Sequence, residues 1–216
     1  VLMLMEPHLS GTVLILGIGA SMMFVGGISQ KMVGLGVGIG VLGIAILASG
    51  VLPYGQSRIM QWKDPWAYAA DEGYQTVQSL LAIGSGGLAG LGFGKGRQKL
   101  MYLPEEHNDM IFAIVCEELG FIGAALILAL FCFLVLRGYW IAVHARDRFG
   151  GLLAVGIITM IAMQTFLNVA VVTNFVPNTG ISLPFFSYGG TALLIQLFEM
   201  GVLLSVSRQM PGPKSG

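Results

Sequence analysis

The sequence has little charge and little cysteine. Only 10% of its 216 residues are Asp, Glu, Lys or Arg, whereas a soluble domain carries about 25%. The 11 basic and 11 acidic residues cancel, so no excess of positive charge indicates a nucleic-acid partner. Two cysteines, Cys116 and Cys132, are too few for a disulfide framework or a zinc site. These shortages exclude an ordinary soluble domain.

The first residues are not expected to be a secretory signal peptide. Residues 1–5 are apolar, with neither an initiator Met nor a basic n-region. We expect them to be the last turns of a helix that begins earlier, and the chain to be the C-terminal part of a longer protein.

Apolar segments of about 20 residues recur along the chain, and each is long enough for a membrane helix. We therefore expect an all-α fold, a polytopic transmembrane helix bundle that forms a single membrane domain over residues 1–216. Five full spans are expected at residues 12–28, 32–52, 110–136, 150–175 and 191–206. Residues 53–109 are expected to form a large extracytoplasmic loop within this domain.

Basic residues in the short connections set the expected orientation, because cytoplasmic loops are enriched in Lys and Arg. One side of the predicted bundle receives Lys31, Arg137, Arg146, Arg148, Arg208 and Lys214. The opposite side receives seven of the eleven acidic residues: Glu6, Asp64, Asp71, Glu72, Glu105, Glu106 and Asp109. Both sets predict that the long loop faces away from the cytoplasm.

An acidic cluster stands directly before the third predicted span. The sequence YLPEEHNDMIFAIVCEELG places Glu105, Glu106, His107 and Asp109 within five positions. A carboxylate at the mouth of a membrane helix loses hydration unless something compensates it, so we expect chemistry or binding there. The alternative is a solvated helix start, where acidic residues are favoured by the helix dipole. That alternative explains Glu105 and Glu106 better than His107 and Asp109.

A glycine-rich segment, GSGGLAGLGFGKGRQK, precedes this cluster. Its spacing partly fits a dinucleotide-binding motif, but that motif requires a βαβ unit. The remaining alternatives are a flexible hairpin and an anion site. In the second, Lys95, Arg97 and Lys99 lie beside backbone N–H groups and bind an anion such as a phosphate at headgroup level.

Further polar residues are placed by spacing alone. A surface helix is expected over residues 66–82, and the spacing of Gln75 and Gln78 places them on one face of it. The two amides either bind sugar hydroxyls or simply belong to the polar side of a surface helix. Arg58 either anchors the membrane interface or pairs with a phosphate. Of Glu117 and Glu118, one is expected to face an internal cavity, the alternative being that both are hydrated near the interface.

Three motifs of the sequence resemble those of a known family. The run GYQTVQSLLAIGSGGLAGLGFGKGRQKLMYLPEEHNDMIFAIVCEELGFIG and the later TGISLPFFSYGGT resemble the FtsW/RodA/SpoVE (SEDS) family, as does the early MEPHLSGTVLIL. The resemblance implies the last five helices of a ten-helix fold. It also implies a peptidoglycan glycan-strand polymerase that uses lipid II in the bacterial cytoplasmic membrane, for division, elongation or sporulation, with a class B penicillin-binding protein as partner.

The same resemblance implies which residues act. The family's catalytic aspartate lies in a His-Thr-Asp-Phe sequence, which matches His107 to Met110 here; Asp109 keeps the aspartate, while Asn108 and Met110 depart from the pattern. Asp109 is then the catalytic base of an inverting transfer that makes a β-1,4 linkage. The expected substrate-binding residues are Arg58, Gln75, Gln78, Lys95, Arg97, Lys99, His107 and Ser187. Glu105 and Glu106 are expected to hold a divalent cation, Mg²⁺ or Mn²⁺.

Two other functions stay open from the sequence. One is a flippase for the lipid-linked precursor, which would place polar groups at both membrane faces. The other is a scaffold that only recruits the penicillin-binding protein. The outward bias of the acidic residues favours the enzyme, although the chain by itself is expected to be inactive.

Overall fold

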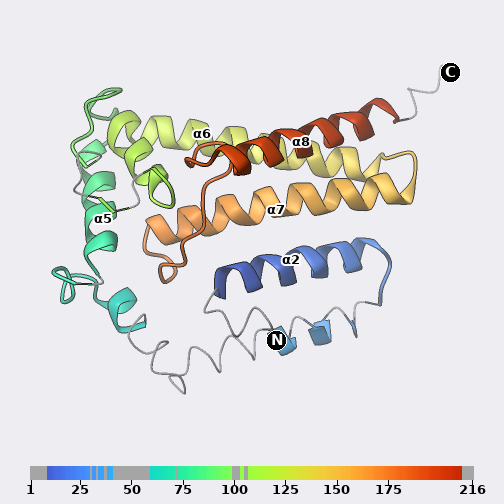
Figure 1. Ribbon diagram of the computed structural model, residues 1–216, viewed down its shortest axis with the longest axis horizontal. Coiled ribbons are helices and arrows are strands. Elements are labelled where there is room, and N and C mark those ends of the chain that lie inside the picture. The colour runs from blue at the N-terminus through green and yellow to red at the C-terminus, as the bar shows by residue number, and fades with distance from the viewer. Residues whose placement is uncertain are drawn as a thin grey trace. The chain divides into compact units, whose positions relative to one another are not determined.

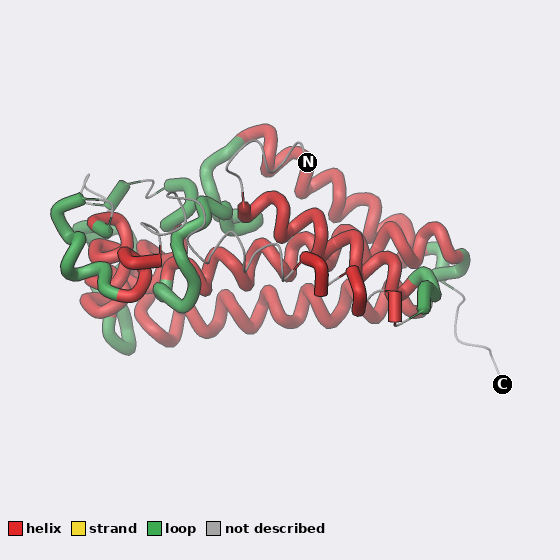
Figure 2. Tube along the Cα trace, turned by 90° about the horizontal axis from the view of Figure 1, so that it is seen from below, coloured by secondary structure: helices red, strands yellow, loops and turns green. Residues whose placement is uncertain are grey.

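The computed structural model describes residues 9–29, 31–32, 34–36, 38–40, 59–71, 73–98, 103–104 and 107–210. Across these ranges the regular structure is helical, with no strand (Figure 2). Figure 1 labels the helices that have defined bounds, which are α2 (Leu9–Val25), α5 (Tyr74–Gly86), α6 (Ile111–Val143), α7 (Arg148–Val172) and α8 (Gly190–Arg208). The predicted all-α class is confirmed.

Three helices, α6, α7 and α8, are long and apolar enough to cross a membrane, and α2 is a shorter apolar helix. These correspond to four of the five predicted spans. For the remaining one, residues 31–32, 34–36 and 38–40 are helical, and residues 41–52 lie outside the described residues. The total of five spans stays a prediction.

The predicted end of the third span, at Leu136, is wrong by seven residues. Helix α6 continues through Arg137, whose guanidinium lies 4.2 Å from the centre of the Trp140 ring. This cation–π contact shields the charge, and a long basic side chain can stay in the helix while its head reaches the interface. The connection is therefore only residues 144–147, and the Asp147 carboxylate begins α7 by accepting a hydrogen bond from Gly150 N (2.9 Å).

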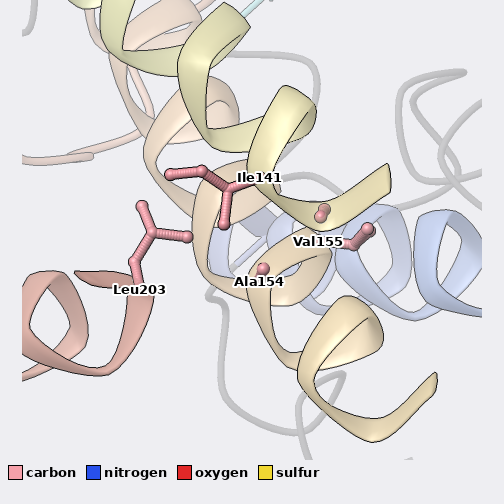
Figure 3. Packing of buried hydrophobic residues seen from close by; sticks show 5 residues of the cluster. Ile141, Ala154, Val155 and Leu203 are labelled. Atoms are coloured by element: carbon pink, nitrogen blue, oxygen red, sulfur yellow. The ribbon is translucent and has the colours of Figure 1, made fainter. Parts of the chain in front are cut away.

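The chain forms two compact units, residues 1–40, 130–163 and 189–216 in the first and residues 41–129 and 164–188 in the second. Ile141 of α6, Ala154 and Val155 of α7 and Leu203 of α8 form a buried cluster in the first unit (Figure 3). Outside that cluster, Tyr139 Oη and Thr159 Oγ1 are 2.9 Å apart. This pair satisfies two hydroxyl groups inside an apolar bundle.

The second unit contains the polar loop, and its helix differs from the one predicted over residues 66–82. Residues 65–71 form turns, and α5 begins only at Tyr74 and continues through Gly84 to Gly86. Gly73 explains the late start, because a Cβ there would lie 2.7 Å from Pro65 O. Ser79 of α5 is fully buried and donates to Val172 O at the end of α7 (2.8 Å).

Candidate active site

Asp109 lies immediately before α6 and is half-buried. The next residue, Met110, is fully buried, so the chain enters the protein interior directly after the carboxylate. The dipole of α6 favours a negative charge at its first turn. The half-buried Asp109 side chain is partly accessible, as a proton acceptor requires.

The segment that carries Asp109 is hydrogen-bonded to the loop after α7. Tyr188 N donates to His107 O (2.7 Å), and the Ser187 hydroxyl donates to Asn108 O (2.7 Å) while accepting from Leu183 N (2.7 Å). The hydroxyl of Ser187 thus braces the loop, and its predicted role in substrate binding has no test here. His107 is exposed. The segment around Asp109 and the segment around Ser187, which carry the two long sequence motifs, thus lie together in one site.

Asn168 of α7 completes this junction, and the sequence reasoning missed it. Its side chain is fully buried, and Nδ2 donates to both Asp109 O (2.7 Å) and Ile181 O (2.7 Å). An amide within an apolar span is itself a signal of function, because burying it is costly without partners. Asn168 therefore ties the backbone of the candidate base to the loop.

Gly180 adds a steric constraint beside the carboxylate. Its φ is +65°, and a Cβ at this position would lie 3.2 Å from Asp109 Oδ2. A left-handed backbone and close approach both favour glycine. The absence of a side chain leaves room next to the candidate base.

Gln75 bridges α5 to both neighbouring segments. Its Oε1 accepts from Asn178 Nδ2 (2.7 Å), and its Nε2 donates to Pro104 O (3.4 Å). Gln78 is half-buried. The predicted contact of Gln75 and Gln78 with sugar hydroxyls stays a prediction, and the structure shows a bracing role for Gln75.

The glycine-rich loop differs from the anion site that the sequence suggested. Its backbone N–H groups donate to the protein's own carboxylates: Gly94 N (2.9 Å) and Gly96 N (3.3 Å) to Glu118, and Arg97 N (2.8 Å) and Gln98 N (3.2 Å) to Glu117. Both glutamates are buried. The expectations of a cavity-facing or hydrated glutamate are therefore wrong, because the carboxylates replace their lost hydration with these N–H groups.

Helix α6 is interrupted next to these glutamates. Gly120 has φ +67° and ψ −171°, which is not helical. Phe121 N donates to Gly87 O (2.9 Å) and Ile122 N to Leu88 O (3.1 Å), while Glu117 O accepts from Leu91 N (3.0 Å) and Glu118 O from Gly92 N (3.0 Å). The loop thus replaces the helical hydrogen bonds that the break removes.

Several predicted site residues lie outside the described residues, namely Arg58, Lys99, Glu105 and Glu106. Lys95 and Arg97 are exposed on the glycine-rich loop. The described residues contain no group of three His, Cys, Asp or Glu side chains that could hold a metal ion. Glu105 and Glu106 lie outside the described residues, so the divalent cation stays a prediction.

Comparisons with known proteins show the family to which the chain belongs. The family model described as "Cell cycle protein", FTSW_RODA_SPOVE, matches residues 1–211. The "Probable peptidoglycan glycosyltransferase FtsW" of Geobacter sulfurreducens is 42% identical over 214 residues, covering 98% of this chain and 57% of that protein. "Stage V sporulation protein E" of Bacillus subtilis is 47% identical over 205 residues, covering 94% of this chain and 55% of that protein.

A solved structure is similar as well. It is described as "Structural coordination of polymerization and crosslinking by a peptidoglycan synthase complex", and one of its chains matches with a TM-score of 0.76 and 27% identity. The match covers 98% of this chain and 59% of that chain. The chain therefore spans little more than half the length of the relatives that it matches, and it belongs to the FtsW/RodA/SpoVE family of membrane proteins.

Proposed function

We propose that the whole protein is a peptidoglycan glycosyltransferase that polymerises glycan strands from lipid II at the outer face of the bacterial cytoplasmic membrane. One observation carries the proposal: a half-buried aspartate is fixed at the start of a membrane helix by backbone contacts to a second loop. The relatives' names support the same reaction.

Asp109 acts as the general base in a single displacement. The donor carries its lipid pyrophosphate on an α-anomeric carbon, and the product linkage is β-1,4, so the configuration inverts and no covalent enzyme intermediate is needed. The acceptor hydroxyl oxygen bonds to the anomeric carbon as the bond from that carbon to the pyrophosphate oxygen breaks. The hydroxyl proton passes to the Asp109 carboxylate.

The rigidity of the junction suits this role. A base must lie within hydrogen-bond reach of the hydroxyl, and a displacement of about 1 Å can lower a rate by roughly 100-fold. Asn168 and Ser187 hold the backbone on either side of the Asp109 carboxyl group. They act as positioning residues in this proposal and not as catalytic ones.

The leaving pyrophosphate requires positive charge. The candidates from the sequence are Arg58, Lys95, Arg97 and Lys99. For cross-linking, we propose a class B penicillin-binding protein as partner, because the similar solved structure is described as a complex for polymerisation and crosslinking.

An assay in detergent separates a polymerase from a flippase. The full-length protein with its partner is given lipid II in micelles, where no second compartment exists and transport yields no product. A polymerase forms long glycan strands, which gel electrophoresis resolves. Lipid II that remains monomeric with the intact complex, while the same preparation moves it across vesicle membranes, would refute the proposal in favour of transport.

A further inference from the structure

We propose that the loop Gly87–Gln98, here called the glycine loop, is a bilayer-binding element. In this arrangement its apolar side chains lie among phospholipid acyl chains, and Lys95 and Arg97 bind the phosphates of phospholipid headgroups. The inference concerns the membrane surface and is independent of the glycosyl transfer. It rests on the hydrogen bonding, the exposure and the position of this loop.

Hydrogen bonding in the glycine loop is unusually complete. Eight backbone N–H groups donate to acceptors within the protein, namely those of Gly90, Leu91, Gly92, Gly94, Lys95, Gly96, Arg97 and Gln98. A loop in water has no need of this, because water satisfies its N–H groups. A backbone polar group without a partner is costly where water is scarce, so these internal hydrogen bonds lower the cost of placing the loop against the bilayer surface.

The buried glutamates supply the acceptors that water would otherwise provide. Glu117 accepts from Arg97 N and Gln98 N, and Glu118 accepts from Gly94 N and Gly96 N. The exposed fraction is 1% for Glu117 and 8% for Glu118. These hydrogen bonds give the two carboxylates a structural role, and neither carboxylate takes part in the proposed glycosyl transfer.

Apolar side chains of the glycine loop point away from the protein. The exposed fraction is 72% for Leu88 and 88% for Phe93, and Leu91 is also exposed. Beside them, Phe121 and Ile122 of α6 are exposed too, and hydrogen bonds to Gly87 O and Leu88 O join the two segments. Phe121 and Ile122 belong to a helix capable of crossing a membrane, and the exposed apolar residues of the glycine loop are held beside this helix by the two hydrogen bonds.

Along α6, the cationic part of the glycine loop comes before the exposed apolar side chains, as the headgroup layer of a bilayer comes before its acyl chains. Before Gly120 the helix is mostly buried in protein, and from Phe121 to Leu136 its exposed side chains are apolar. The cationic part of the loop is held at Glu117 and Glu118, roughly one helical turn, or about 5 Å, nearer the start of α6. That offset is close to the thickness of the headgroup layer.

The exposed cations are placed for headgroup phosphates. Lys95 and Arg97 of the glycine loop are both exposed. Lys and Arg near the membrane surface attract anionic lipids by about 1 kcal/mol each. This proposal assigns Lys95 and Arg97 to phospholipid phosphates and leaves Arg58 and Lys99 as the sequence's candidates for the leaving pyrophosphate.

A fluorescence experiment tests the depth of the loop. In the full-length protein with Cys116 and Cys132 replaced by Ala, a Phe93→Cys variant carries an environment-sensitive fluorophore in nanodiscs of phosphatidylcholine and phosphatidylglycerol. We expect a blue-shifted emission that is quenched by lipids spin-labelled near the top of the acyl chain and not by iodide. The same label at Arg146→Cys, in an exposed charged turn, is expected to be quenched by iodide.

The phosphate contact is tested in the same preparation. Spin-labelled phosphatidylglycerol is expected to quench the Phe93→Cys label at least about twofold more than spin-labelled phosphatidylcholine, because two cations attract the anionic lipid. Replacing both cations, by Lys95→Gln and Arg97→Gln, should remove this difference between the two lipids. Iodide quenching at position 93 would overturn the membrane placement, and equal quenching by both lipids would overturn the phosphate contact. Loss of the difference on adding one equivalent of lipid II would show a substrate site in place of a bilayer site.

Discussion

At the scale of single residues, the site depends on a few side chains that bond to backbone. The side-chain amide of Asn168 donates to two backbone carbonyls, and the Ser187 hydroxyl donates to one backbone carbonyl and accepts from one backbone N–H. Such contacts fix the path of the chain on either side of Asp109. In the proposed mechanism, Asn168 and Ser187 therefore act by positioning Asp109.

Replacing Asn168 tests this positioning. Asn168→Leu leaves the carbonyls of Asp109 and Ile181 without their donor, which costs about 1–3 kcal/mol for each buried group, and lets Asp109 shift. We expect turnover in the glycan polymerisation assay to fall by about 10- to 100-fold, with the KM for lipid II nearly unchanged.

Gln164 provides the matched control, because it lies one turn earlier on α7 and its buried Oε1 has no hydrogen-bond donor in the described part of the chain. Gln164→Leu is therefore expected to keep turnover within about twofold, since no hydrogen bond to this oxygen is lost. A fall in turnover as large as that of Asn168→Leu would show that general packing, and not the Asn168 amide, supports the site.

At the scale of elements, α6 combines two different environments. Up to Glu118 it lies mostly within protein, and beyond Gly120 it presents apolar side chains outward. The break at Gly120 lets the glycine loop enter the hydrogen-bond ladder of the helix. The break is thus a joint that is held by four replacement hydrogen bonds.

Gly120→Ala is predicted to destabilise this joint. Its φ and ψ lie in a region that is essentially restricted to glycine, at a cost of about 1–3 kcal/mol for other residues, and a Cβ would collide with Gly90 N and Leu88 O. We expect a lower midpoint of thermal unfolding, measured by tryptophan fluorescence of the full-length protein in detergent.

Gly84→Ala is the control for this change, because Gly84 lies in α5 with open space around its Cβ position. It is expected to leave the midpoint unchanged or to raise it slightly, since Ala is favoured over Gly in a helix. If both variants unfolded at the temperature of the original protein, the break at Gly120 would not be a strained, glycine-dependent joint.

The sequence predicted these elements unevenly, for physical reasons. Apolar runs marked α6, α7 and α8 because length and composition alone make a membrane helix. Arg137 misled the estimate of where α6 ends, because its stacking on Trp140 is a contact that hydropathy does not record. The sequence did not predict the hydrogen bonds of Glu117 and Glu118, because their donors lie about 20 residues earlier in the chain.

At the scale of the whole molecule, the account depends on which side of the membrane each loop faces. The resemblance located Asp109, but Asn168 escaped because its partners are known only in three dimensions. Among the described residues, three helices can cross a membrane. The charges in the short turns then predict that residues 144–147 are cytoplasmic and that Asp109 faces outward.

Labelling of single cysteines tests this orientation. With Cys116 and Cys132 replaced, Tyr188→Cys in the exposed loop beside His107 is expected to react with a membrane-impermeant maleimide in intact cells whose outer surface is accessible to the reagent. Arg146→Cys should react only after permeabilisation. The reverse pattern would place Asp109 in the cytoplasm and remove its access to an extracytoplasmic reaction.

The most direct measurement is glycan polymerisation by the full-length Asp109→Asn variant with its partner, made alongside lipid II binding to the same preparation. The amide cannot accept the hydroxyl proton as a carboxylate does, so we expect turnover to fall by about 100-fold or more while lipid II binds with nearly the original affinity. Polymerisation at the original rate with bound lipid II would contradict the assignment of Asp109 as the base.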